Sequence, residues 1–227
     1  MTSIKDHIYS DLKNRCQEIK EGLYHNFREI MIPDNDALTN LYAVLYFHEM
    51  KHEPENPQWS RSDQLIVSHM PSLPYLLGAT ANAGYLTWDF CEKQFLWVQK
   101  EIRSYSMLLK LPGISGITSL PEFAGEFANG LALNGKHSRF PFRVYSVITP
   151  SANPKLFEAA FPAACSPLDN LTYIAPGVDR ETRILLMHRW FVLGWHIEEV
   201  DFTDLKSVLA GFASASSHRG RPSIIIG

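Results

Sequence analysis

The sequence has few cysteines, little net charge and no long apolar run. Its 227 residues include three cysteines, Cys16, Cys91 and Cys165, without any C-x-x-C spacing, so we expect neither a disulfide framework nor a cysteine zinc site. The formal net charge of −3 provides no basic field for binding nucleic acid or an anionic membrane. No apolar run reaches membrane-spanning length, and the amino-terminal segment is polar and helical in pattern, unlike a secretion signal. These absences predict a cytoplasmic protein with reduced thiols.

The composition is that of a chain with one substantial core. With 45% hydrophobic residues and no internal repeat or linker, residues 1–227 are expected to form a single domain. A helical segment over about residues 1–33 is indicated by apolar residues spaced for one helix face, at Ile4, Ile8, Leu12, Cys16, Ile19 and Leu23.

The segment from Phe142 to Ile174 is the most informative part of the chain. An apolar run over residues 144–148 is typical of a buried parallel strand, and Asn153 is placed to cap a helix whose first turn contains Pro154. A second apolar strand is expected over residues 171–175. This is the pattern of a βαβ unit, and open α/β sheets bind ligands at the carboxyl ends of their strands.

The rest of the chain continues the alternation of helices and strands. Helices are predicted over residues 38–54, 87–109 and 179–193, a strand over residues 195–200, and a further helix starting from a Thr203 cap. The aromatic residues of the 87–109 helix indicate core packing or a subunit contact. The alternation predicts a three-layer α/β/α fold with a mainly parallel sheet and helices on both faces.

One isolated motif suggests a metal site. His48-Glu49-Met50-Lys51-His52 reads H-E-x-x-H, which on a helix places two imidazoles on one face and a glutamate as general base, as in a zinc hydrolase. However, Pro54 ends the predicted helix two residues after His52, and no downstream helix offers a third ligand at a known spacing. Zinc bound by His48, Glu49 and His52 is therefore kept only as a weak alternative.

Several segments resemble one enzyme family in their order and spacing. The chain contains Arg143-Val144-Tyr145, then Phe157-Glu158-Ala159-Ala160, then Leu168-Asp169-Asn170-Leu171-Thr172. It also contains segments that resemble the family's D-P-E-N-P-x-W and G-W-x-V-x-E-V-D motifs, over residues 53–59 and 194–201. Together they resemble the amino-terminal, diphosphate-binding half of transketolases, especially those split over two chains. The resemblance runs from about residue 38 to residue 227 and implies the thiamine-diphosphate-binding fold.

The resemblance fails at the positions where this family holds its cofactor. Met31 stands in place of one cofactor imidazole and Pro71 in place of another. Pro150 replaces the aspartate of the Gly-Asp-Gly turn, and the segment around Gly177 replaces the metal-binding asparagine. The glycine cradle of the diphosphate has become Ser119-Leu120-Pro121-Glu122-Phe123-Ala124, which places a carboxylate near an expected anion.

These departures imply a degenerate subunit rather than an enzyme acting alone. The resemblance implies a partner chain that carries the pyrimidine-binding domain, in a heterotetramer or dimer of heterodimers, with this chain as a scaffold or regulatory subunit that binds neither thiamine diphosphate nor magnesium. The alternative is an active ketol- or acyl-transferring complex that holds thiamine diphosphate and magnesium in a remodelled cleft. The side chains expected to line that cleft are those of Ser68, His69, Thr118, Glu122 and Asn153.

Overall fold

The computed structural model describes residues 4–27, 30, 32–104, 108–149 and 154–227. Within these residues, one sheet contains strands in the order β2-β3-β1-β4-β5-β7-β6. Every neighbouring pair is parallel except β2 and β3, which are antiparallel. The strands are β1 (Gln64–Val67), β2 (Leu109–Leu111), β3 (Ile114–Ile117), β4 (Val144–Val147), β5 (Leu171–Ala175), β6 (His196–Glu199) and β7 (Ser223–Ile226).

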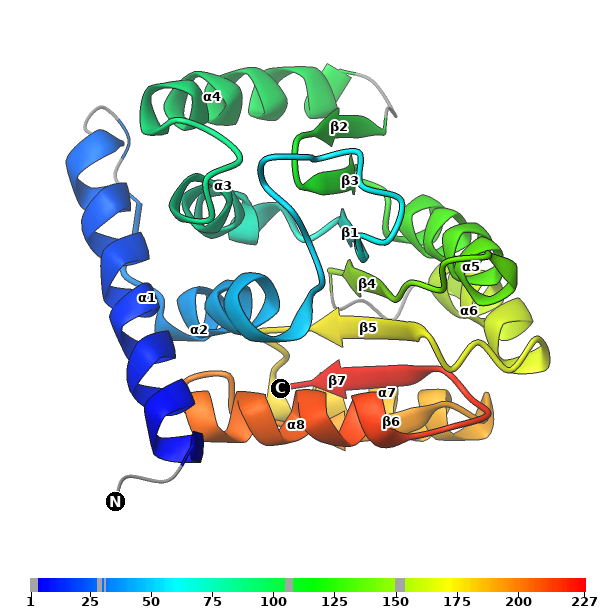
Figure 1. Cartoon of the computed structure of the whole chain (residues 1–227). Helices are drawn as coiled ribbons and strands as arrows, with labels where there is room; N and C mark the ends of the chain where they lie inside the picture. Colours follow the sequence, from blue (N-terminus) through cyan, green and yellow to red (C-terminus); the bar gives the residue numbers. More distant parts are fainter. Residues whose placement is uncertain (1–3, 28–29, 31, 105–107, 150–153) are drawn as a thin grey trace.

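Helices cover both faces of this sheet, which gives the three layers visible in Figure 1. The helices are α1 (Ile4–Asn26), α2 (Asp36–Val44), α3 (Leu73–Asn82), α4 (Trp88–Ser104), α5 (Pro121–His137), α6 (Pro154–Cys165), α7 (Arg180–Val192) and α8 (Leu205–Ser217). One core joins α1, α2, α3, α4 and α8 to the sheet, and a second core joins α5, α6 and α7 to its other face. The predicted three-layer, mainly parallel α/β fold is confirmed.

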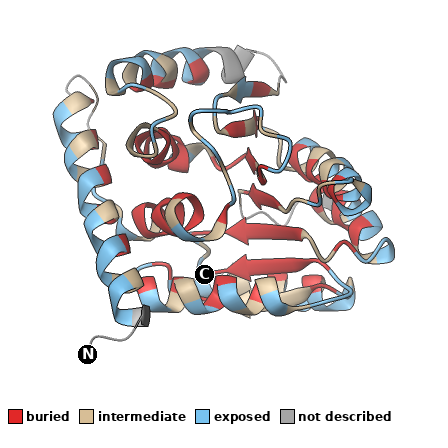
Figure 2. Ribbon diagram, in the orientation of Figure 1, coloured by how far each residue is buried: buried red, intermediate tan, exposed pale blue. Residues whose placement is uncertain are grey.

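Strand side chains alternate between the two cores because successive residues of a strand point to opposite faces. Leu65 and Val67 of β1 belong to the core under α1, α2, α3 and α8, whereas Ile66 between them belongs to the core under α5, α6 and α7. Figure 2 shows the consequence, with buried residues concentrated in the strands and on the inner sides of the helices. Strands that are buried on both faces explain the continuous apolar runs in the sequence.

The predicted βαβ unit over residues 142–174 is present as β4, α6 and β5. The cap predicted at Asn153 lies outside the described residues. In the amino-terminal segment, α1 buries one stripe that includes Leu12, Ile19 and Leu23. All three cysteines are free thiols, with Cys16 and Cys91 buried and Cys165 exposed. Among the described residues, no helix combines the length and apolarity that a membrane span requires.

Three predicted helix boundaries are wrong. The helix expected over residues 38–54 ends in a single π-helical turn, Leu45–Glu49, and Met50 is extended. The helix expected over residues 87–109 ends at Ser104, because the chain then forms the β2–β3 hairpin around Gly113, whose φ is +76°. Helix α8 is capped by Asp204 and not by Thr203, whose N–H and hydroxyl both donate to the Asp201 carboxylate.

Candidate functional site

The carboxyl ends of β1, β3, β4 and β5 lie at one edge of the sheet, which we call the carboxyl edge. Ser68, Thr118 and Thr149 lie just beyond the ends of β1, β3 and β4, and Gly177 lies two residues beyond β5. Helix α3 follows β1 and packs on one face of the sheet, whereas α6 follows β4 and packs on the other. Neighbouring strands whose helices lie on opposite faces form a topological switch point, which is where open α/β sheets bind ligands.

The hydroxyl groups of Thr149 and Thr118 at this edge form hydrogen bonds with backbone groups of the same edge. The Thr149 hydroxyl donates to the Ser68 carbonyl at 2.8 Å, and the Ser68 amide donates to the Val147 carbonyl at 2.8 Å. The Thr118 hydroxyl accepts from the Leu120 amide at 3.3 Å, at the start of α5. Ser68 and Thr118 are buried. The structure therefore brings these two predicted residues to the same edge, but their polar atoms stabilise the ends of the strands.

His69 follows Ser68 and is also buried, with 9% of its surface exposed. Its Nδ1 has no hydrogen-bond partner among the described residues. Because burial disfavours the charged imidazolium, the pKa of His69 is lowered from 6.5 to about 4. At neutral pH the side chain is uncharged, so it offers no positive charge to a phosphate group.

Glu122 lies in the first turn of α5, where it borders a groove of about 540 Å³ between α5 and α6. The sequence also indicated Glu126 as a second carboxylate near the expected anion, and Glu126 lines this groove. Sequence reasoning did not identify the other members of the groove, which are Asn129, Lys155, Glu158, Ala159 and Pro162. Helix amino termini ordinarily attract anions. Here the groove presents three carboxylates and one ammonium group, so its charge opposes the binding of a diphosphate.

Of the positions with altered cofactor motifs, the structure describes Pro71 and Gly177. Met31, Pro150 and Asn153 lie outside the described residues. Pro71 is exposed in the 3₁₀ turn Met70–Ser72, and Gly177 is exposed with a φ of +74°.

A hollow of about 420 Å³ beside Gly177 contains two carboxylates, and both have other partners. Glu199 pairs with Arg183 at 3.1 Å, and Asp201 accepts from Thr203. Magnesium requires converging oxygen ligands, and the described part of the chain contains no group of three His, Cys, Asp or Glu residues that could hold a metal. The described residues at this edge, which do not include the turn over residues 150–153, therefore do not fit a magnesium-bound thiamine diphosphate.

The residues of the H-E-x-x-H motif do not share a helix face. Helical structure ends at Glu49, and the Nε2 of His52 contacts the Tyr46 carbonyl. Glu49 is largely buried and accepts a hydrogen bond from the Ser216 hydroxyl at 3.3 Å, and its burial raises the pKa of the carboxyl. The arrangement of two imidazoles one turn apart on a helix, on which the zinc alternative depended, is absent.

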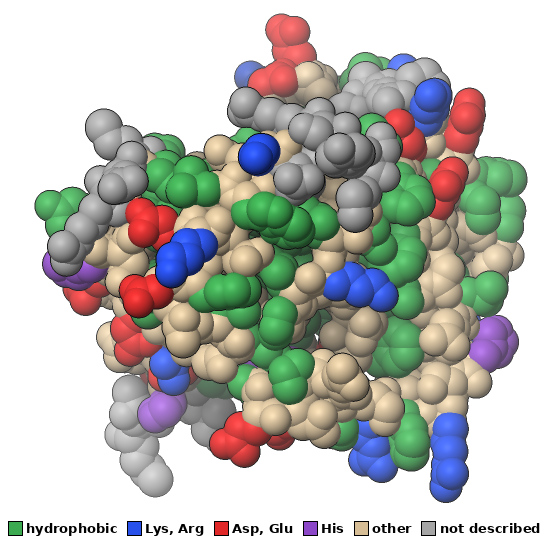
Figure 3. Space-filling view, turned by 90° about the horizontal axis from the view of Figure 1, so that it is seen from above, with side chains coloured by type: hydrophobic (Ala, Val, Ile, Leu, Met, Phe, Trp, Pro, Cys, Tyr) green, Lys and Arg blue, Asp and Glu red, His purple; other side chains and the backbone are tan. Residues whose placement is uncertain are grey.

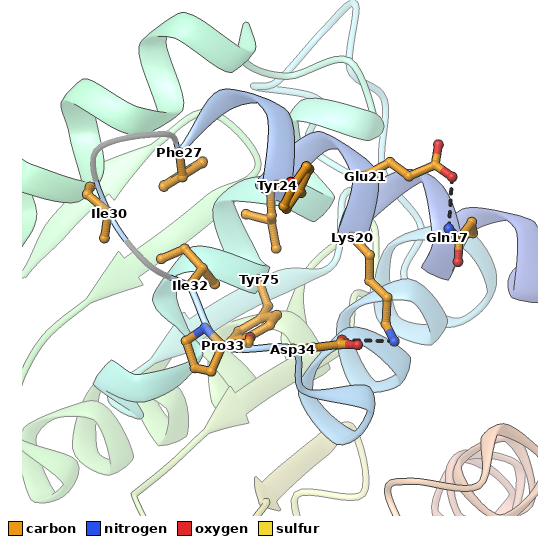
Figure 4. A pocket seen from close by; sticks show the side chains of 11 residues that line it. Gln17, Lys20, Glu21, Tyr24, Phe27, Ile30, Ile32, Pro33, Asp34 and Tyr75 are labelled. Carbon is orange, nitrogen blue, oxygen red and sulfur yellow. Dashed lines mark hydrogen bonds and ion pairs between the residues drawn. The ribbon is translucent and has the colours of Figure 1, made fainter.

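A separate cavity of about 580 Å³ lies between α1 and the segment before α2 (Figure 4). Tyr24, Phe27, Ile32 and Tyr75 give it an apolar wall, and Lys20 pairs with Asp34 at 2.9 Å at its edge. No pattern in the sequence indicated this cavity, although all of its lining residues except Tyr75 lie between residues 17 and 34. The side chains named here offer no nucleophile next to a base, so they indicate no catalytic role.

Comparisons with known proteins give one consistent result, although no family model matches. The 6-deoxy-6-sulfo-D-fructose transketolase subunit of Clostridium sp. strain MSTE9 is 26% identical over 201 residues, which are 84% of this chain and 73% of that protein. Human transketolase is 24% identical over 205 residues, which are 84% of this chain and 32% of the human protein.

Solved structures show the same fold. Transketolase from Leishmania mexicana superposes with a TM-score of 0.66 at 18% identity, covering 100% of this chain and 36% of that one. A transketolase from Pichia stipitis superposes with a TM-score of 0.69 at 17% identity, covering 93% of this chain and 35% of that one. This chain thus spans about a third of these transketolases. Its homologues are transketolases and transketolase-like proteins, and it matches an amino-terminal-like part of them.

Proposed function

We propose that this chain is a transketolase-type subunit that keeps the diphosphate-binding scaffold but no longer binds thiamine diphosphate and magnesium. The observation that carries this proposal is the chemistry of the carboxyl edge. Its hydroxyl groups bond to the backbone, and its histidine is neutral at pH 7. The groove between α5 and α6, which includes Glu122 of the first turn of α5, presents three carboxylates and one ammonium group. Each of these features disfavours a bound diphosphate, and none offers a ligand set to the metal.

The scaffold is proposed to act in a complex. We propose a separate subunit with a pyrimidine-binding domain as its partner, in a heterotetramer or dimer of heterodimers. In support, the Clostridium relative is by its name a subunit of a transketolase, and the chain covers 73% of that relative but 32% of human transketolase. A chain of this length is compatible with one half of a divided enzyme.

The second candidate is an active complex with a remodelled cofactor site. It is favoured by the position of Ser68, His69, Thr118 and Glu122 around the same switch point, and by a relative that is by its name a sugar transketolase subunit. In that case a partner chain would supply the charges that this edge lacks.

Cofactor binding separates the two candidates. The complex is purified from its own host, and native mass spectrometry measures its subunits and bound small molecules. The complex and a full-length transketolase are then titrated with thiamine diphosphate and magnesium by calorimetry. We expect the purified heteromer to contain no cofactor and to give no heat of binding with thiamine diphosphate and magnesium. The transketolase control should give a heat of binding under the same conditions. Stoichiometric thiamine diphosphate in the heteromer would refute the scaffold proposal and support the active complex.

A further inference from the structure

Helix α7 exposes an unusual amount of apolar surface. Phe191 and Val192 are each 71% exposed, Ile184 is 61% exposed and Leu185 is 45% exposed. The opposite side of the helix is buried in the core through Leu186 and Trp190. Residues at positions i, i+1, i+7 and i+8 of a helix lie on one face. The four exposed residues therefore form a single stripe, which we call the α7 stripe, along the outer side of α7.

The residues of the α7 stripe are placed symmetrically before and after His188 in the sequence. Ile184 and Leu185 lie four and three residues before His188, and Phe191 and Val192 lie three and four residues after it. His188 is itself exposed on this face. A two-fold symmetric contact requires a surface that is complementary to itself, with each residue facing a counterpart across the axis. An antiparallel pair of α7 helices centred on His188 meets this requirement.

We propose that the α7 stripe is the contact between two copies of this chain, packed antiparallel about a two-fold axis at His188. Ile184 of one copy then faces Val192 of the other, and Leu185 faces Phe191. This inference concerns a surface outside the carboxyl edge, so it does not depend on the proposed function.

The size of the stripe suits such a contact. Its four side chains expose roughly 500 Å², near the upper end of the largest apolar patches on monomeric proteins, about 300–600 Å². A standard interface buries about 800 Å² on each partner, of which the apolar centre is a part and a polar rim the remainder. Such a rim can be formed by three exposed charged residues. They are Arg180 and Glu181 of α7 and Glu199 of the neighbouring strand β6.

The adjacent edge of the sheet is a poorer contact for a second copy. Strand β6 is the edge strand next to β7, and it carries His196, Glu198 and Glu199. Charged residues on an edge strand oppose pairing with another strand. The contact is therefore assigned to the helix and not to the strand edge.

The first test measures oligomeric state. Sedimentation velocity of the chain expressed alone is expected to show a dimer. The double variant Ile184→Glu/Phe191→Glu places like charges in the contact and should weaken dimerisation by at least about 100-fold. Both sites are exposed, so the fold should be retained, which circular dichroism checks. Tyr24→Glu, at a residue 82% exposed on α1, is the matched control and should remain dimeric.

The second test locates the axis. In a Cys165→Ser background, His188→Cys should form a disulfide between chains on mild oxidation, because facing Cα atoms of helices packed 8–10 Å apart come within about 6 Å. Glu181→Cys, two turns from the axis, should not.

Three results would overturn the proposal. The first is a chain that is monomeric at about 100 μM and forms no His188→Cys crosslink. The second is a dimer that persists in the Ile184→Glu/Phe191→Glu variant, and the third is a monomeric chain whose position 188 becomes protected from thiol labelling only in the native heteromer. The last would assign the stripe to the other subunit.

Discussion

The buried imidazole of His69 makes the stability of this protein depend on pH. In the unfolded chain a histidine takes up a proton near pH 6.5. In the folded protein, burial lowers the pKa of His69 to about 4. Between these two values the unfolded state binds a proton that the folded state does not. The free energy of unfolding must therefore fall as the pH falls from 6.5 towards 4, and it is unaffected by this group above pH 7.

The size of the effect follows from the two pKa values. At pH 5 the difference in proton binding lowers the free energy of unfolding by about 2 kcal/mol, whereas at pH 7 the loss is about 0.2 kcal/mol. A loss of 2 kcal/mol is a large part of the 5–15 kcal/mol that stabilises an ordinary domain. Because 9% of the surface of His69 is exposed, little solvent screening reduces this figure.

The test compares urea unfolding of the natural protein and of His69→Gln at pH 7 and pH 5. The glutamine cannot take up a proton, so its variant should lose about 2 kcal/mol less stability over this interval. His137→Gln, at an exposed histidine, is the control and should behave like the natural protein. Equal losses in the natural protein and in His69→Gln would refute the reasoning, because they would show that His69 titrates alike in both states.

Two further predictions concern packing and buried hydrogen bonds. Asp63 accepts the Lys51 amide at 2.8 Å and the Arg143 amide at 2.7 Å through different oxygens, so Asp63→Asn should cost about 2–3 kcal/mol in urea unfolding. A change within 0.5 kcal/mol, the usual range of a surface substitution, would contradict this. A Cβ at Gly211 would lie 2.3 Å from Cγ1 of Val200, so Gly211→Ala should lower stability by about 1–3 kcal/mol. Thermal unfolding measures this loss, and Val200→Ala in the same chain should recover part of it.

The sequence predicted the elements with a strong period and missed the boundaries that depend on distant residues. The βαβ unit was predictable because β4 and β5 are continuous apolar runs. The end of the second helix was not predictable. Helical structure there gives way to a segment in which the Lys51 amide donates to the carboxylate of Asp63. That contact forms only when β1 is in place. The cap at Asp204 was missed for a local reason, since Asp201, two residues earlier, binds the threonine that sequence reasoning chose.

The candidate site was predictable in location but not in chemistry. The family resemblance, and not a predicted strand, suggested that Ser68 and Thr118 line one cleft, and in the structure both residues follow strand ends at one edge of the sheet. That their polar atoms bond to the backbone, and that burial keeps His69 neutral, depends on packing that no local pattern encodes. The exposed stripe of α7 was equally hidden. Residues 184–187 and 190–192 are apolar on several sides of the helix, so the sequence did not show which side faces solvent.

Exposed apolar residues are also found on α4, where they leave the predicted role of its aromatic residues open. Phe95 is buried, whereas Phe90, Leu96 and Trp97 are 40–50% exposed. Figure 3, which views the molecule from the α4 side, shows hydrophobic side chains in several groups separated by charged and polar ones. The described side chains of this surface form no continuous apolar stripe like that of α7, so they give a weaker indication of a subunit contact.

Three of the family-like residues that remain in this chain, Arg143, Asp169 and Asn170, have a common location and a common role. Arg143 donates to the Ser216 carbonyl at 2.8 Å, and Asn170 donates to the carbonyls of Ala132 and Phe142. Asp169 accepts from the Gly220 amide at 3.2 Å. All three precede a strand or lie beside its start, at the edge of the sheet opposite the candidate site.

The altered motifs, in contrast, follow strand ends or begin helices at the carboxyl edge. Glu122 lies in the first turn of α5, Gly177 follows β5, and Pro150 follows β4 in the sequence. Residues that hold the fold together and residues that would hold a cofactor thus lie at opposite edges of one sheet. Substitutions at the carboxyl edge can remove the cofactor without breaking the hydrogen bonds that define the fold. This separation gives a physical reason why a chain can lose cofactor chemistry and remain a folded partner for another subunit, and it supports the proposal of a scaffold.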